Sequence, residues 1–64
     1  MKNYYELSGK RLMVLKPFDI YNANDIVDVI TAHQKSFTIR KSSEYLPMTI
    51  NFGRNAFKQY FQVL

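Results

Sequence analysis

The sequence predicts a mainly β protein, a small α+β domain in which one helix follows the strands. A run of β-branched residues at 26–31 and an alternation of apolar with polar residues at 37–41 and 48–52 indicate strands. β-branched side chains lose rotamer freedom in a helix and pack well on a pleated sheet, and alternation directs every second side chain to one face. Apolar residues at helical spacing after residue 55 indicate the helix.

The N-terminal part of the chain is expected to form a hairpin. Two short segments, at about 2–7 and about 10–16, are predicted as strands joined across Ser8-Gly9, and Pro17 ends the second one. Residues 17–24 are rich in turn-forming types and are expected to connect this hairpin to the next strand.

The segment at 26–32 has two interpretations. Asn24 could cap a helix that runs to Lys35. Against this, five of the six residues at 26–31 are β-branched, which favours a strand in which Val27, Val29 and Thr31 share one face. We expect the strand.

The C-terminal half supplies two more strands, at about 36–41 and about 48–52, and a helix at about 55–63. Asn55 is a suitable N-cap, and the apolar positions that follow recur at i, i+3, i+4 and i+7, which places them on one stripe that must dock on the sheet. The expected core consists of Leu12, Val14, Val29, Phe37, Ile39, Ile50, Phe57 and Phe61.

The length of 64 residues predicts a single domain spanning 1–64. A chain this short buries only about 60% of the surface that its unfolded form exposes. It has no cysteine to add a disulfide, but its five Phe and five Tyr residues offer large apolar surfaces to bury. Its longest apolar run is too short to cross a bilayer, so we expect a cytoplasmic protein that does not bind a membrane.

The order of the predicted elements is hairpin, connection, second hairpin, fifth strand and helix. In this order the chain resembles SH3-like or chromo-like domains, in particular the small archaeal chromatin proteins, which carry a C-terminal helix on a five-stranded, partly open barrel. The resemblance concerns the layout of most of the chain and no signature motif, so it implies no role for individual residues. It implies that the domain binds nucleic acid or peptides, although a fold does not determine a function.

Residue types that support catalysis or metal binding are not clustered in the sequence. His33 is the only histidine, and the two glycines are too few for a phosphate-binding loop. Asp25 and Asp28 are close in sequence, but a chain this small has little room for the cleft that would shift their pKa values. We therefore expect no enzymatic activity, no catalytic residue, no metal and no cofactor.

The charge pattern points to a polyanion. The net charge is +4, and three of the five acids lie at 19–28 with basic residues on either side. Sites for single-stranded nucleic acids combine a positive groove with aromatic rings on which bases stack. The prediction is a nucleic-acid-binding module whose positive face is formed by Lys10, Arg11, Lys35, Arg40 and Lys41, with Tyr4, Tyr5 or Tyr45 as stacking platforms.

An alternative is a protein-interaction module, such as an inhibitor, adaptor or assembly subunit. It would act through an exposed aromatic patch, a sheet edge or a homodimer, since interfaces favour Tyr, Phe, Met and Arg. The abundance of Asn, Lys, Ile and Tyr is typical of AT-rich genes, which are common in phages and mobile elements. The two functions differ in the expected effect of salt, which weakens nucleic-acid binding steeply.

Overall fold

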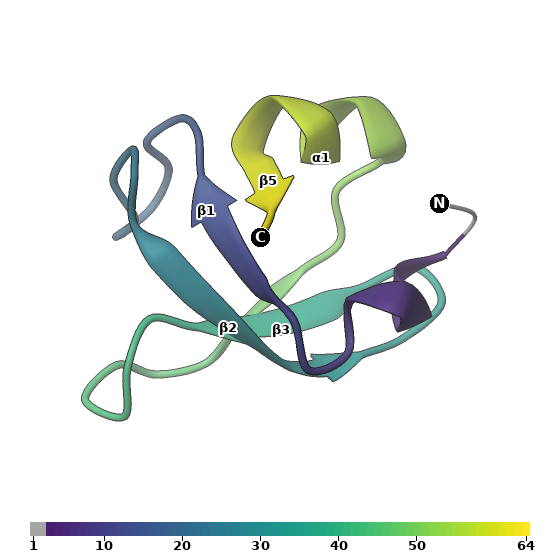
Figure 1. Cartoon of the computed structure of the whole chain (residues 1–64), viewed down its shortest axis with the longest axis horizontal. Coiled ribbons are helices and arrows are strands. Elements are labelled where there is room, and N and C mark those ends of the chain that lie inside the picture. Colours follow the sequence, from purple (N-terminus) through teal and green to yellow (C-terminus); the bar gives the residue numbers. More distant parts are fainter. Residues whose placement is uncertain (1–2) are drawn as a thin grey trace.

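Five antiparallel strands form one sheet in the computed structural model, which describes residues 3–64 (Figure 1). The strands lie in the order β4-β3-β2-β1-β5, so the first strand lies between the second and the last. The sheet does not close into a barrel. The mainly β prediction is confirmed. The elements in chain order are a 3-10 helix η1 (Tyr4–Leu7), β1 (Arg11–Val14), β2 (Ile26–Ala32), β3 (Phe37–Arg40), β4 (Met48–Ile50), α1 (Arg54–Tyr60) and β5 (Phe61–Val63).

The predicted strand at 2–7 is wrong, because its described part forms η1. The side chain of Asn3 accepts a hydrogen bond from the Tyr5 N–H and so caps the 3-10 helix. Residues three apart lie on the same side of a 3-10 helix, and Tyr4 and Leu7 are both buried there. The predicted hairpin across Ser8-Gly9 is therefore absent; Gly9, with φ of 74°, instead turns the chain from η1 into β1. Residue 2 lies outside the described part.

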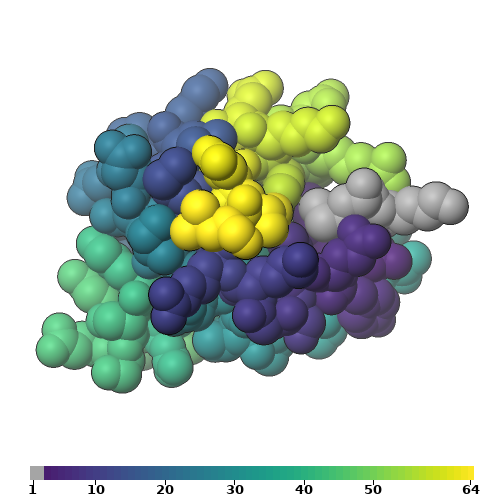
Figure 2. Space-filling model, viewed as in Figure 1, coloured from purple at the N-terminus to yellow at the C-terminus, as the bar shows by residue number. Residues whose placement is uncertain are grey.

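The predicted helix at 55–63 is correct only for its first part. The helix α1 ends at Tyr60, its N-cap is Gly53 instead of Asn55, and the next three residues form β5. In β5, Phe61 pairs with Val14 and Val63 pairs with Leu12 of β1. A helix of this length is marginal alone, whereas pairing satisfies the otherwise open edge of β1. Figure 2 shows the result: the C-terminal residues (yellow) lie between the N-terminal segment (purple) and α1 (yellow-green).

The strands β2, β3 and β4 lie close to their predicted positions. The helical interpretation of 24–35 is wrong. Asn24 has φ of 73°, a left-handed conformation that an N-cap does not adopt, and its N–H donates to the Val14 carbonyl. Val27 and Val29 are buried as expected. Thr31 is exposed, because the register of β2 against β3 shifts between Val29 and Thr31.

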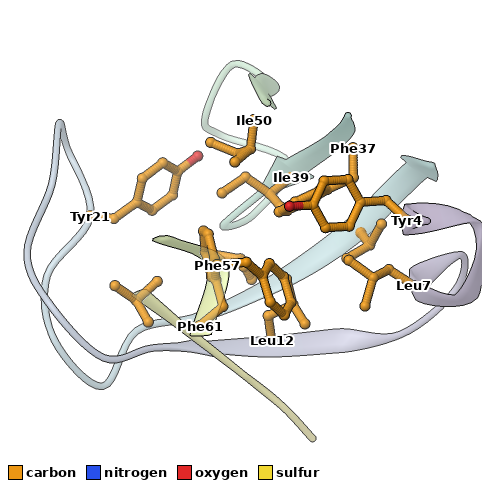
Figure 3. Close-up of a cluster of buried hydrophobic side chains, with 12 residues drawn as sticks. Tyr4, Leu7, Leu12, Tyr21, Phe37, Ile39, Ile50, Phe57 and Phe61 are labelled. Carbon is orange, nitrogen blue, oxygen red and sulfur yellow. The ribbon is translucent and has the colours of Figure 1, made fainter. Parts of the chain in front are cut away.

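Five of the twelve buried hydrophobic residues in the described chain are aromatic, and they pack among aliphatic side chains in the core (Figure 3). All eight predicted core residues are buried. Phe37 lies at its centre, with ring centroids 4.9 Å from Tyr4, 5.7 Å from Phe57 and 5.6 Å from Phe61. These contacts join η1 and α1 to one face of the sheet and link β3 with β5, so the same rings that stabilise the domain also position the surface between η1 and α1. The buried residues outside the predicted core are Tyr4, Leu7, Tyr21 and Val27.

Candidate functional site

The predicted basic residues lie in two separate regions. The first, here called the sheet face, is the outward side of β1, β2 and β3. Arg11 pairs with Asp28 across β1 and β2, and Asp28 pairs with Arg40 across β2 and β3. The Arg11 Nε donates to the Asp28 Oδ1 at 3.1 Å. In the strand register Asp28 therefore lies between Arg11 and Arg40, and its carboxylate pairs with the Arg11 guanidinium, which lowers the positive potential of this row.

A second ion pair lies beside this row. Lys41 Nζ is 3.2 Å from Asp25 Oδ2, and it also lies 5.4 Å from the centroid of the Tyr45 ring. The backbone N–H of Asn22 donates to the same carboxylate at 2.8 Å. This bond, together with Lys41, holds the pKa of Asp25 below its ordinary value. Together the sheet face and this ion pair place three basic residues against two acids.

The three tyrosines predicted as stacking platforms differ in exposure. Tyr4 is only 5% exposed and its hydroxyl donates to the Phe52 carbonyl, so its assignment as a stacking platform is wrong. Burial raises the pKa of Tyr4. Tyr45 is partly exposed, with Lys41 over its ring. Tyr5 is 58% exposed and retains an open ring. The 3-10 helix turns Tyr4 inward and leaves Tyr5 outward because only positions three apart share a side.

Lys10 and Lys35 lie away from the sheet face, in two grooves between η1 and α1. The larger one, here called the main groove, has a volume of about 360 Å³. Its floor is apolar and its rim is charged, with Glu6 as the one acid among the described lining residues. The full lining is Glu6, Leu7, Lys10, Arg54, Phe57, Lys58 and Val63.

The second groove adjoins the first and has a volume of about 280 Å³. Arg54 lines both grooves, and Lys35 adds a further cation to the second. We call the two grooves together the seam. Among the described residues, the seam gathers four bases, Lys10, Lys35, Arg54 and Lys58, around one acid. The second groove is lined by Asn3, Tyr4, Gln34, Lys35, Asn51, Phe52, Gly53 and Arg54.

Arg54 and Lys58 were not among the predicted site residues. Both lie on α1, four residues apart, so they share one side of the helix. Their spacing in the sequence could have indicated a basic side of α1, because the buried stripe that begins at Phe57 lies on the other side of the helix. Lys10 could be linked to them only through the pairing of β5 with β1, which brings Val63 next to the start of β1.

The chemistry available at the seam is the binding of an anion with an apolar part. Residues 3–64 contain no group of three or more His, Cys, Asp or Glu side chains able to hold a metal ion. In the same part of the chain no helix has the length and apolar character needed to cross a bilayer. Comparison with protein-family models, with curated proteins and with solved structures finds no match. The grooves and their charges are therefore the basis for assigning a function.

Proposed function

We propose that this protein is a small non-enzymatic module that binds nucleic acid through the seam. The observation that carries the proposal is the concentration of four bases around one acid in two adjoining grooves. The remaining charges of the described chain are more nearly balanced, since Arg11, Arg40 and Lys41 lie beside Asp25 and Asp28. A local excess of positive charge in a concave surface attracts a polyanion more strongly than the same charge spread evenly.

An exposed aromatic side chain next to the grooves adds to the support that the basic residues give to nucleic acid as the ligand. Phosphate groups bind to lysine and arginine side chains, and release of counterions from the nucleic acid drives that binding. The exposed Tyr5 lies on η1 between Tyr4, which lines the second groove, and Glu6, which lines the main groove. A base that leaves either groove therefore has an aromatic ring on the neighbouring element.

We also propose that the domain is SH3-like. The strand order β4-β3-β2-β1-β5, the long connection between β1 and β2, and the short helix before β5 support this assignment. In such a meander the first strand pairs with the last, which is the arrangement of β1 and β5. The fold itself leaves the ligand open, so the assignment adds no weight to nucleic acid over protein.

A protein partner is the second candidate, and the sheet face favours it. Met13 pairs with Ile26 across β1 and β2, and Ile26 and Ile30 are both exposed on the outward side of β2. The strands β4 and β5 are also the edges of the described sheet, and an edge can pair with another strand. A partner bound there, including a second copy of this chain, would contact apolar side chains and respond little to salt.

A pair of matched variants tests the proposal. The variant Lys10→Gln with Lys58→Gln removes two positive charges from the seam, and Arg11→Gln with Arg40→Gln removes two from the sheet face. If each lysine contacts one phosphate of a single strand, the seam variant should lose about 60-fold in affinity at about 50 mM salt and about tenfold at about 200 mM. Its logarithmic salt slope should become shallower by about 1.4.

The sheet-face variant serves as the control and should stay within about threefold of the wild type at both salt concentrations. Binding is measured by fluorescence anisotropy with labelled DNA and RNA oligomers. Equal losses in the two variants would show that net charge alone matters and would contradict a site at the seam. No binding by the wild-type protein at low salt would favour the protein partner.

A further inference from the structure

We propose that the seam binds single-stranded rather than double-stranded nucleic acid, with a base entering the main groove and the next part of the strand lying along the second groove. This inference rests on the proposed function and narrows its ligand. It follows from the shape of the basic surface, the chemistry of the main groove and the order of the cations.

The shape of the basic surface is concave. A protein reads a duplex by inserting a protruding helix or ribbon into the major groove, which is about 12 Å wide. Here Lys10, Arg54 and Lys58 line a hollow, and α1 packs Phe57 inward instead of projecting from the surface. The two hollows, of about 360 and about 280 Å³, have the size of small-ligand sites. They accommodate parts of a flexible strand, whereas a rigid duplex would contact only their rims.

The main groove combines two kinds of surface that a nucleotide needs. Its floor consists of Leu7, Phe57 and Val63; Leu7 and Phe57 are buried, and Val63, which is 41% exposed, offers apolar contact to a base. Its rim carries Lys10, Lys58 and Arg54, which attract phosphate. In a duplex the bases are stacked and paired, so the floor would stay unused. In a single strand the bases are accessible to such a floor.

The cations follow a path from one groove to the other. Lys10 and Lys58 belong to the main groove, Arg54 to both, and Lys35 to the second groove. A strand that passes along the seam therefore meets a positive charge throughout its course. A positive groove that follows the backbone, together with surfaces that receive bases, is the arrangement found in single-strand binding sites.

Filling the main groove without changing any charge tests the inference. Val63→Trp places a large side chain in the groove, and Gln62→Trp places the same side chain on the opposite side of β5, where Gln62 pairs with Met13. The probes are a labelled single strand of about 12 nucleotides and a blunt-ended duplex of the same length. The wild-type protein should bind the single strand at least about tenfold more tightly than the duplex.

Val63→Trp should lower single-strand affinity by about tenfold or more with an unchanged salt slope, while Gln62→Trp should stay within about twofold. Circular dichroism and thermal melting confirm that both variants fold. Lys35→Gln gives an independent reading and should weaken binding of the single strand by about eightfold at about 50 mM salt. Unchanged binding by Lys35→Gln would show that the strand does not lie along the second groove and would overturn the inference.

The outcomes separate this inference from the function on which it rests. Equal or tighter binding of the duplex, or full binding by a folded Val63→Trp, would overturn the single-strand inference and leave nucleic-acid binding at the seam in place. A mononucleotide that binds as tightly as the 12-nucleotide strand would also overturn it, because the second groove would then contribute nothing. Absence of binding to either probe at low salt would overturn both.

Discussion

The seam and the sheet face draw on the same kinds of residue but differ in how their charges are arranged. On the sheet face, Asp28 lies between Arg11 and Arg40 in the strand register. In the seam, four bases surround Glu6 alone among the described lining residues. The difference arises from topology, because β2 carries its acid into the middle of the sheet, whereas the bases of the seam come from α1 and from the segments that hold Lys10 and Lys35, and η1 adds only Glu6. Position relative to acids, more than the number of bases, distinguishes a candidate site from an ordinary charged surface.

The largest expected effect is a loss of folding stability, which would disrupt the seam and the sheet face together. Phe61 lies in β5 and its ring packs against Phe37 and Phe57. Phe61→Ala should lower the free energy of unfolding by about 3–5 kcal/mol, which is comparable to the whole stability of a small domain. Urea denaturation measures this, with Leu46→Ala, at an exposed position, as a control that should change stability by less than about 0.5 kcal/mol. An unchanged melting temperature would mean that β5 does not hold the seam together.

A smaller change affects only the wall of the second groove. Tyr4→Phe keeps the ring in the core and removes the hydroxyl that donates to the Phe52 carbonyl. The free energy of unfolding should fall by about 1 kcal/mol, since a partly buried hydrogen bond is lost. Tyr5→Phe is the matched control, because that hydroxyl belongs to an exposed side chain and its loss should have no measurable effect. Equal stability of the two variants would contradict the role of this bond.

Removing an acid from the sheet face tests whether the acids there prevent it from binding a polyanion. Asp28→Asn leaves Arg11 and Arg40 without the carboxylate between them, so the sheet face should begin to attract a polyanion. If one new phosphate contact results, affinity for a single strand should rise about threefold at about 200 mM salt. Asp19→Asn makes the same change of net charge on an exposed turn and should have a smaller effect. An equal rise in both variants would show that only the net charge matters.

The smallest expected effect is a pH dependence of stability that comes from Asp25. Its pKa is held below the ordinary value of 3.8 by the Asn22 N–H and by Lys41, so its contribution to stability is complete above that pH and is lost as the pH falls through the lowered value. Asp25→Asn should therefore be less stable than the wild type at about pH 6, and the difference should shrink at about pH 3. Lys41→Gln should retain part of this dependence, because the Asn22 bond remains. A pH-independent difference would contradict the assignment.

The parts of the fold that follow from local patterns could be predicted from the sequence. Alternation located β3 and β4, and β-branched residues distinguished β2 from a helix. The errors lie at the two ends. At 4–7 the capping by Asn3 and the burial of two residues three apart produce a 3-10 helix. The short aromatic segment at 2–7 contains no pattern that distinguishes this helix from a strand. At 61–63 pairing with β1 overrides a helical pattern, and such a long-range contact has no local signature.

The candidate site was harder to predict than the fold. Lys10 and Lys35 were predicted as members of one basic surface with Arg11, Arg40 and Lys41, but the structure places Lys10 and Lys35 in the seam and the other three on or beside the sheet face. The grouping assumed a hairpin between 2–7 and 10–16 that does not form. Once β5 takes that place beside β1, the neighbours of Lys10 become residues of α1, and the local charge changes with them.

The pairing of β1 with β5 also has a kinetic meaning. It joins Leu12 to Val63 and Val14 to Phe61, so a loop of about fifty residues must close before the main groove has its floor. Contacts of such high sequence separation slow folding, because the entropy of the connecting chain is lost before they form. The strands β2, β3 and β4 follow one another in the chain and can pair without this step. A molecule that has stopped at that stage has a partial sheet and no ligand site, so binding activity would report the completion of folding instead of its onset.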